Sequence, residues 1–82
     1  MTKEEILTRI VSELQNVAPG CEPEHADPDA DLREELDIDS MDFLNFIIAL
    51  HKKLDIEIPE SDYPKLSTLN NVVTYIENKL AG

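Results

Sequence analysis

Apolar residues recur at helical spacing near the start of the chain, which predicts a first helix from about Lys3 to Asn16. Thr2 and Glu5 open this helix as a T-x-x-E capping box, in which each side chain accepts a hydrogen bond from the other residue's backbone amide. Pro19 and the glycine after it end the helix. The apolar stripe comprises Ile6, Ile10, Leu14 and Val17, with Leu7 and Val11 beside it.

A second helical pattern runs from about Ser40 to Leu54 without glycine or proline. Asp39 is a good N-cap for this helix, and Asp42 adds negative charge in the first turn, where the helix dipole favours anions. One face carries an apolar arc of roughly 100°, which is the width of a stripe that packs on a core. That face comprises Phe43, Phe46, Ile47, Leu50 and Leu54.

The same helix has a second apolar stripe, formed by Met41, Leu44 and Ile48 and pointing almost opposite to the first. A bundle this small can hardly bury both faces. Either a short third helix or a loop covers the second stripe, or the stripe is an exposed docking surface for a partner protein. In the second case Ser40, at the N-terminal end of the stripe, lies next to the partner.

A long polar connection, ending at about Asp39, separates these two helices. Its length is unusual within a compact domain and indicates either disorder or function. It holds nine of the 18 acidic residues of the chain and a single base among them, Arg33. The negative potential is therefore concentrated just before Ser40. The expected anchors of the connection to the core are Leu32, Leu36 and Ile38.

The C-terminal part of the chain predicts an extended segment and two more helical pieces. Ile56 and Ile58 alternate with polar residues, but a proline follows at once and no partner strand is evident, so we expect a loop. A short helical turn near residues 61–65 comes next, and Ser67 or Thr68 then caps a last helix. Its apolar positions are Leu69, Val72, Val73, Ile76 and Leu80. The predicted fold is an all-α, small four-helix bundle of three longer helices and one short helix, forming a single domain over residues 1–82.

Composition and charge narrow the classes of function. The chain has 82 residues and a net charge of −11, with only seven lysines and arginines, so nucleic acid and anionic membrane surfaces are unsuitable partners. Basic protein surfaces suit it better. No apolar run approaches the ~18 residues of a membrane span, and the N-terminal segment lacks the apolar stretch of a signal peptide. We therefore expect a cytoplasmic monomer.

The residues with reactive side chains do not form a catalytic set. His25 and His51 have no neighbouring acid or motif that would pair them with a nucleophile, and Cys21 has no partner for a disulfide and no metal-ligand spacing around it. We expect all three to be incidental or solvated, and the protein not to be an enzyme. The run from Asp27 to Ile38 fails as an EF-hand loop, since position 6 is not glycine and position 12 is not glutamate. We predict no metal site.

Ser40 lies where a helix N-terminus stabilises an attached phosphate through its free amides and dipole. The stretch "LREELDIDSMDFLNFIIALHKKLDIEIP", continued by "LSTLNNVVTYI", resembles the acyl carrier proteins, whose pattern is an acidic loop, D-S-L at the start of the second helix, and then an F/L-x-I-x-I-P segment. The resemblance covers almost the whole chain. It implies that Ser40 carries a 4′-phosphopantetheine arm, with Asp39 as the acid of the motif, and that the arm holds an acyl group as a thioester.

The resemblance also implies partners. These are a phosphopantetheinyl transferase (holo-ACP synthase), an acyl ligase or acyltransferase, and synthases or transferases with basic docking patches in fatty-acid, modified-lipid or polyketide biosynthesis. The family positions that make apolar contact with partners correspond to Met41, Leu44 and Ile48 in this chain. The negative surface that basic patches recognise corresponds in part to Asp42, Glu57 and Glu60.

Two departures from the family pattern affect the expected pathway. No acid occurs from Phe43 to Leu54, where housekeeping fatty-acid carriers place carboxylates, so we expect a specialised carrier with its own partners. The rings of Phe43 and Phe46 border the cleft that shelters acyl chains in this family, and we expect them to shrink or reshape it. A D-alanyl, aryl or peptidyl carrier is an alternative, and an acidic helical interaction module, unmodified or weakly calcium-binding, is an alternative of another class.

Overall fold

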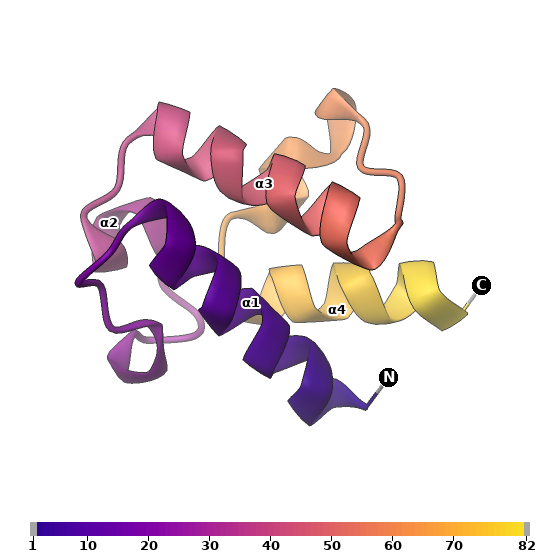
Figure 1. Ribbon diagram of the computed structural model, residues 1–82, viewed down its shortest axis with the longest axis horizontal. Helices are drawn as coiled ribbons and strands as arrows, with labels where there is room; N and C mark the ends of the chain where they lie inside the picture. The colour runs from indigo at the N-terminus through magenta and orange to yellow at the C-terminus, as the bar shows by residue number, and fades with distance from the viewer. Residues whose placement is uncertain (1, 82) are drawn as a thin grey trace.

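A computed structural model of the protein describes residues 2–81 and shows an all-α fold. Its elements are α1 (Lys3–Val17), η1 (Pro23–His25), α2 (Leu32–Leu36), α3 (Ser40–Leu54), η2 (Glu60–Leu66) and α4 (Leu69–Ala81), where η denotes a 3₁₀ helix. Figure 1 shows α1 crossing in front of α4, with α3 above both and η2 behind α3. Ile56 and Ile58 lie in a loop, as expected. Over residues 2–81, no helix has the length and apolar character needed to cross a membrane.

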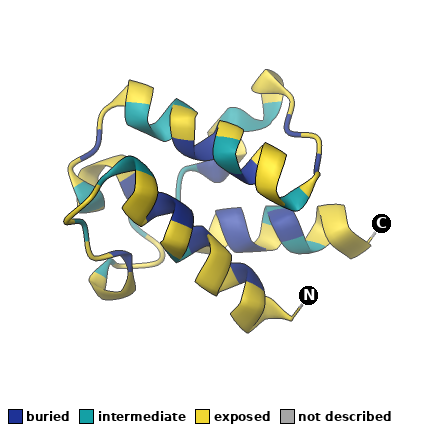
Figure 2. Cartoon of the chain, viewed as in Figure 1, coloured by how far each residue is buried: buried dark blue, intermediate teal, exposed yellow. Residues whose placement is uncertain are grey.

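The core lies where α1, α3 and α4 face one another. The buried residues of each helix turn toward this centre, as the dark blue bands on the facing sides of the ribbons show (Figure 2). The predicted core face of α3 is largely confirmed, since Phe46, Ile47 and Leu50 are almost fully buried. Phe43 and Leu54 are only half-buried at its edges. On α4 the buried stripe ends at Ile76, and Leu80, which we expected in the stripe, is 40% exposed.

The predicted helix caps are present. Thr2 and Glu5 form the capping box of α1, and Asp39 caps α3. For α4, the side chain of Thr68, not that of Ser67, accepts a hydrogen bond from the amide of Asn71 at 3.1 Å. Each cap satisfies amide groups that have no partner inside the helix, so these local sequence signals determine where the helices begin.

The connection between α1 and α3 is more ordered than its polar sequence suggests. It contains η1 and α2, neither of which we predicted, because each is too short to show helical periodicity. Its backbone is bonded to the start of α4: the amide of Leu32 donates to the carbonyl of Ser67 at 2.8 Å, and the amide of Asn70 donates to that of Pro28 at 3.0 Å. Leu32 belongs to the core and the half-buried Leu36 packs against it, so these two predicted anchors contact the core, while Ile38 is buried outside that cluster.

Candidate functional site

Ser40 is the first residue of α3 and is exposed. The carboxylate of Asp39 accepts a hydrogen bond from the amide of Asp42 at 2.8 Å, which fixes the first turn of the helix. The amides of Ser40 and Met41, at the first two helical positions, have no carbonyl acceptor within the helix. They face outward at the positive end of a 15-residue helix, beside the serine hydroxyl.

Two hollows meet at Ser40. The first is a cleft of about 460 Å³ between α3 and η2, which we call the α3–η2 cleft. It is lined by Arg33, Ser40, Phe43, Leu44, Glu60, Tyr63, Pro64 and Ser67. The second, the acidic hollow, measures about 440 Å³ and is lined by Asp31, Arg33, Glu34, Asp37, Ile38, Asp39 and Ser40. A group attached to Ser40 thus has a partly apolar cleft on one side and a cluster of carboxylates on the other.

Arg33 lines both hollows and is the residue at this site that sequence reasoning missed. Its Nη1 lies 3.4 Å from Ser40 Oγ, and its guanidinium lies over the ring of Phe43, 5.7 Å from the ring centroid. The sequence did contain a signal, since Arg33 is the single base in the acidic connection. Only the turn of the chain between α2 and α3 brings that base back to the serine.

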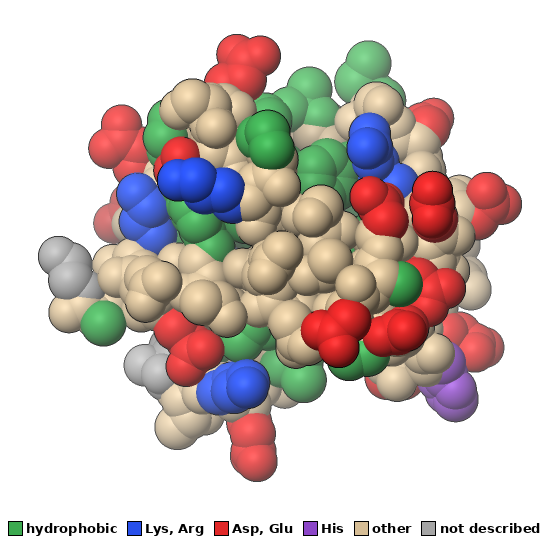
Figure 3. All heavy atoms as spheres, turned by 180° about the vertical axis from the view of Figure 1, so that it is seen from behind, with side chains coloured by type: hydrophobic (Ala, Val, Ile, Leu, Met, Phe, Trp, Pro, Cys, Tyr) green, Lys and Arg blue, Asp and Glu red, His purple; other side chains and the backbone are tan. Residues whose placement is uncertain are grey.

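The structure divides the second apolar stripe of α3. Met41 is 64% exposed and Ile48 is 39% exposed, whereas Leu44 is half-buried and faces the α3–η2 cleft. The short helix η2 therefore partly covers one of the three residues and leaves the other two exposed to solvent. Apolar side chains surface along the top of Figure 3, over α3 and η2, and carboxylates gather on the side where α2 lies.

The acidic residues that we assigned to a partner surface are not all at one place. Asp42 lies in the first turn of α3, which Asp39 caps, and Glu60 lines the cleft beside Ser40. Glu57 is exposed, and its charge acts on Tyr75 of α4, outside both hollows. Of the two expected phenylalanines, Phe43 lines the cleft, while Phe46 is fully buried behind it.

A contact between η2 and α4 holds one wall of the cleft. The hydroxyl of Tyr75 donates a hydrogen bond to Asp62 Oδ2 at 2.6 Å, and Lys65 Nζ lies 3.3 Å from Asp62 Oδ1. The hydrogen bond from Tyr75 is the main cause of a lowered pKa at Asp62. Burial, followed by the hydrogen bond to Asp62, raises the pKa of Tyr75 to about 12. Both shifts favour the neutral phenol and the ionised carboxylate that this contact requires.

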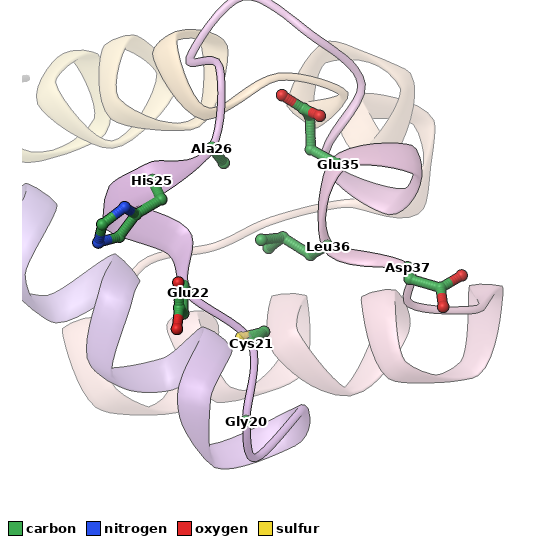
Figure 4. Close-up of a pocket in the computed structure, with 8 residues that line it drawn as sticks. All are labelled: Gly20, Cys21, Glu22, His25, Ala26, Glu35, Leu36 and Asp37. Atoms are coloured by element: carbon green, nitrogen blue, oxygen red, sulfur yellow. The ribbon is translucent and has the colours of Figure 1, made fainter.

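The other candidate residues have structural contacts. Figure 4 shows a separate hollow of about 350 Å³ between the loop after α1 and α2, with Leu36 pointing into it and His25 pointing away. Cys21 lines this hollow, is half-buried, and lies with its Sγ 3.6 Å from the carbonyl of Leu14, so it packs against the core instead of being solvated. Burial, reinforced by Glu24, raises the pKa of this thiol and makes it a poor nucleophile. His51 is exposed but bonds the carbonyl of Ile56 through Nδ1.

The three aspartates of the rejected calcium loop each accept hydrogen bonds within the fold. Asp27 accepts from the amide of Asp29, Asp29 from the side chain of Asn70, and Asp31 from the amide of Arg33. These bonds turn the carboxylates toward different neighbours. Among residues 2–81, no three side chains of His, Cys, Asp or Glu are grouped as a metal ion would need.

Comparisons with known proteins identify the family. Residues 5–76 match the family described as "Phosphopantetheine attachment site". The chain is 33% identical over 82 residues to the acyl carrier protein of Thermosynechococcus vestitus, with full coverage of both chains. It is 40% identical over 75 residues to that of Campylobacter hominis, covering 92% of this chain and 89% of that one.

Two further matches agree with this result. The meromycolate extension acyl carrier protein of Mycobacterium leprae is 34% identical over 77 residues, covering 94% of this chain and 66% of that protein. A solved structure of the acyl carrier protein from Enterococcus faecalis has a TM-score of 0.77 at 25% identity, covering 96% of this chain and 99% of that one. The chain therefore belongs to the acyl carrier protein family. Members of this family are carriers and not enzymes, and they bear a covalently attached 4′-phosphopantetheine group.

Proposed function

We propose that Ser40 is the attachment residue and that residues 1–82 form one acyl carrier domain. The observation that supports this most is the position of the exposed hydroxyl, at the first residue of α3 and at the junction of the two hollows. In the attachment step, Ser40 Oγ forms a bond to the phosphorus of the pantetheine phosphate of coenzyme A. The pyrophosphate bond breaks, adenosine 3′,5′-bisphosphate leaves, and the hydroxyl proton is lost. A separate transferase catalyses this step.

The surroundings of Ser40 suit such a group. The free amides at the start of α3 and the guanidinium of Arg33 are donors for a phosphodiester, and the α3–η2 cleft offers a partly apolar surface for the arm. When bound, the group supplies a thiol that holds the acyl chain as a thioester. The protein's own part is to present that thiol to partner enzymes.

Mass spectrometry tests the attachment residue. The protein is incubated with coenzyme A and a promiscuous phosphopantetheinyl transferase, and we expect one phosphopantetheine to be added to the wild type. Ser40→Ala should gain no mass, whereas Ser61→Ala, which removes another exposed hydroxyl on η2, should be modified like the wild type. An unmodified wild type, or an undiminished gain on Ser40→Ala, would show that the proposal is wrong.

We further propose that partners dock along the outer face of α3. The residues concerned are Met41, Leu44 and Ile48, with Asp42, Glu57 and Glu60 as part of the negative surface. The exposure of Met41 and Ile48 on one helix face supports this surface, since exposed apolar patches rimmed by polar residues are typical of partner sites. The expected partners are the transferase, an acyl ligase or acyltransferase, and synthases with basic patches. That the carrier acts as a monomer in the cytoplasm stays a prediction.

The charge along α3 supports a specialised carrier. Its exposed face runs from Met41 through Asn45 and Ile48 to Lys52, so it is acidic only near Ser40 and basic at its C-terminal end. A partner with an extended basic patch is repelled by that end, whereas a partner with an acidic group there is attracted. We therefore expect slow acyl transfer from enzymes that serve an ordinary fatty-acid carrier.

A charge-reversal experiment tests the specialised role. Asn45→Glu combined with Lys52→Glu should increase the rate with a fatty-acid ketosynthase that has a basic docking patch, and the gain should shrink as salt screens the charges. Lys3→Glu, a charge reversal on α1, serves as the control. A wild type already as fast as the variant would contradict the specialised role. Loading assays with D-alanyl, aryl and peptidyl ligases separate the alternative carriers, because each ligase discriminates its own carrier.

A further inference from the structure

Arg33 is the basic residue among the described side chains that line the two hollows at Ser40. The acidic hollow alone contains Asp31, Glu34, Asp37 and Asp39. A phosphodiester on Ser40 adds a further negative charge to this surface, so every nearby carboxylate repels it. Arg33, whose guanidinium lies within reach of Ser40 Oγ, can therefore attract this phosphate, which no other side chain lining these hollows does through its charge.

The contacts of Arg33 within the protein leave most of its donors available. Its Nη1 lies at the long distance of 3.4 Å from Ser40 Oγ, and its Nε lies 3.9 Å from Asp31 Oδ1. The side chain is 49% exposed, and a surface ion pair at that distance is weak. The cation–π contact with Phe43 keeps the guanidinium near the serine without using its N–H groups. Arg33 is thus held in place by packing, while a planar fork of five donors stays largely free.

We propose that Arg33 is a positioning residue for the prosthetic group: it donates hydrogen bonds to the phosphodiester formed on Ser40. The non-bridging oxygens of that phosphate lie one covalent bond beyond the phosphorus on Oγ, and Nη1 already reaches Oγ itself. A charged acceptor then takes the place of a neutral hydroxyl, so both partners of the hydrogen bond carry charge and the pair can bond through two N–H groups. This inference rests on the attachment at Ser40.

Arg33 lies over Phe43 and lines the α3–η2 cleft. A hydrogen bond from Arg33 to the phosphate therefore also affects the position from which the phosphopantetheine arm extends. A phosphate bonded to Arg33 stays at the junction of the two hollows, both of which Arg33 lines. The lone base in the acidic connection thereby has a function that its sequence neighbours do not share.

The two arginines of the chain provide an internal control. Arg9 lies on α1 and lines a different hollow, with Thr2, Glu4, Glu5 and Thr8. We expect the side-chain ¹⁵N and ¹H NMR signals of Arg33 to shift when the apo protein is converted to the holo form, while those of Arg9 do not move. Equal signals for Arg33 in the two forms would overturn the proposal.

Variants provide a second readout on the phosphorus itself. Arg33→Gln should shift the ³¹P signal of the holo protein and remove its dependence on salt, and Arg33→Lys should restore part of both effects. Arg9→Gln, which removes the same charge elsewhere, should match the wild type. A ³¹P signal that is the same in Arg33→Gln and Arg9→Gln refutes the role of Arg33. Mass spectrometry of each sample separates this failure from that of the proposed function, since only the latter leaves the wild type without the added group.

Discussion

Replacing Asp39 by alanine removes the side-chain acceptor that caps α3. The carboxylate accepts a hydrogen bond from the amide of Asp42 at 2.8 Å, and both residues lie near the surface, so the loss includes no cavity term. Loss of an N-cap lowers the free energy of unfolding by about 0.5–2 kcal/mol. The negative charge near the helix N-terminus accounts for about 0.3–1 kcal/mol of such stabilisation.

Two substitutions divide this effect between the hydrogen bond and the charge. Asp39→Asn keeps an acceptor and loses only the charge, so we expect it to lose about 0.5 kcal/mol, against about 1.5 kcal/mol for Asp39→Ala. A domain of this size changes its melting temperature by about 4–8 °C per kcal/mol, which thermal unfolding followed by circular dichroism resolves easily. Glu34→Gln, which removes one charge from the same acidic hollow, is the control.

The relative order of the three variants is the test. If Asp39→Asn and Asp39→Ala lose equal stability, the hydrogen bond is not what stabilises the start of α3. If Glu34→Gln and Asp39→Asn change stability equally, the charge of Asp39 has no effect beyond that of another carboxylate in the acidic hollow.

Two further predictions concern the core and the wall of the cleft. Leu50→Ala, at a position with no solvent exposure, should lower the free energy of unfolding by about 2–5 kcal/mol. Ile48→Ala, on the outer face of α3, should lower it by less than about 1 kcal/mol. Urea titration measures both losses, and similar values would contradict the assigned faces. The pKa of Tyr75 rises from its ordinary value of 10 to about 12 in the folded protein. Between these values the folded state binds more protons than the unfolded state, so stability falls as pH rises, and Tyr75→Phe should lack that loss. At the acidic end, the lowered pKa of Asp62 has the opposite sign: stability falls as pH drops through it, and Asp62→Asn should lack that change. Chemical unfolding over a range of pH checks both signs, and parallel pH curves for the variants and the wild type would contradict them.

Local sequence signals determined the limits of the main helices. The caps at Thr2 and Asp39 and the apolar periodicity of α1, α3 and α4 predicted these elements, because capping and amphipathic spacing act within a few residues. The same locality explains the omissions. α2 is only five residues long, and its start is bonded to Ser67, far along the chain, so its own sequence carries too weak a signal.

The sequence by itself also determined the class of the protein, since the serine after Asp39 at the start of a helix and the acidic connection before it are features of neighbouring residues. Tertiary structure alone decided how these features are used. It placed Leu44 against η2 and left Met41 and Ile48 exposed, separated Glu57 from Glu60, and brought Arg33 to within 3.4 Å of Ser40 Oγ. The physical reason is that these outcomes depend on how separate helices and turns are arranged against one another, and the periodicity and capping of a single helix carry no information about that arrangement.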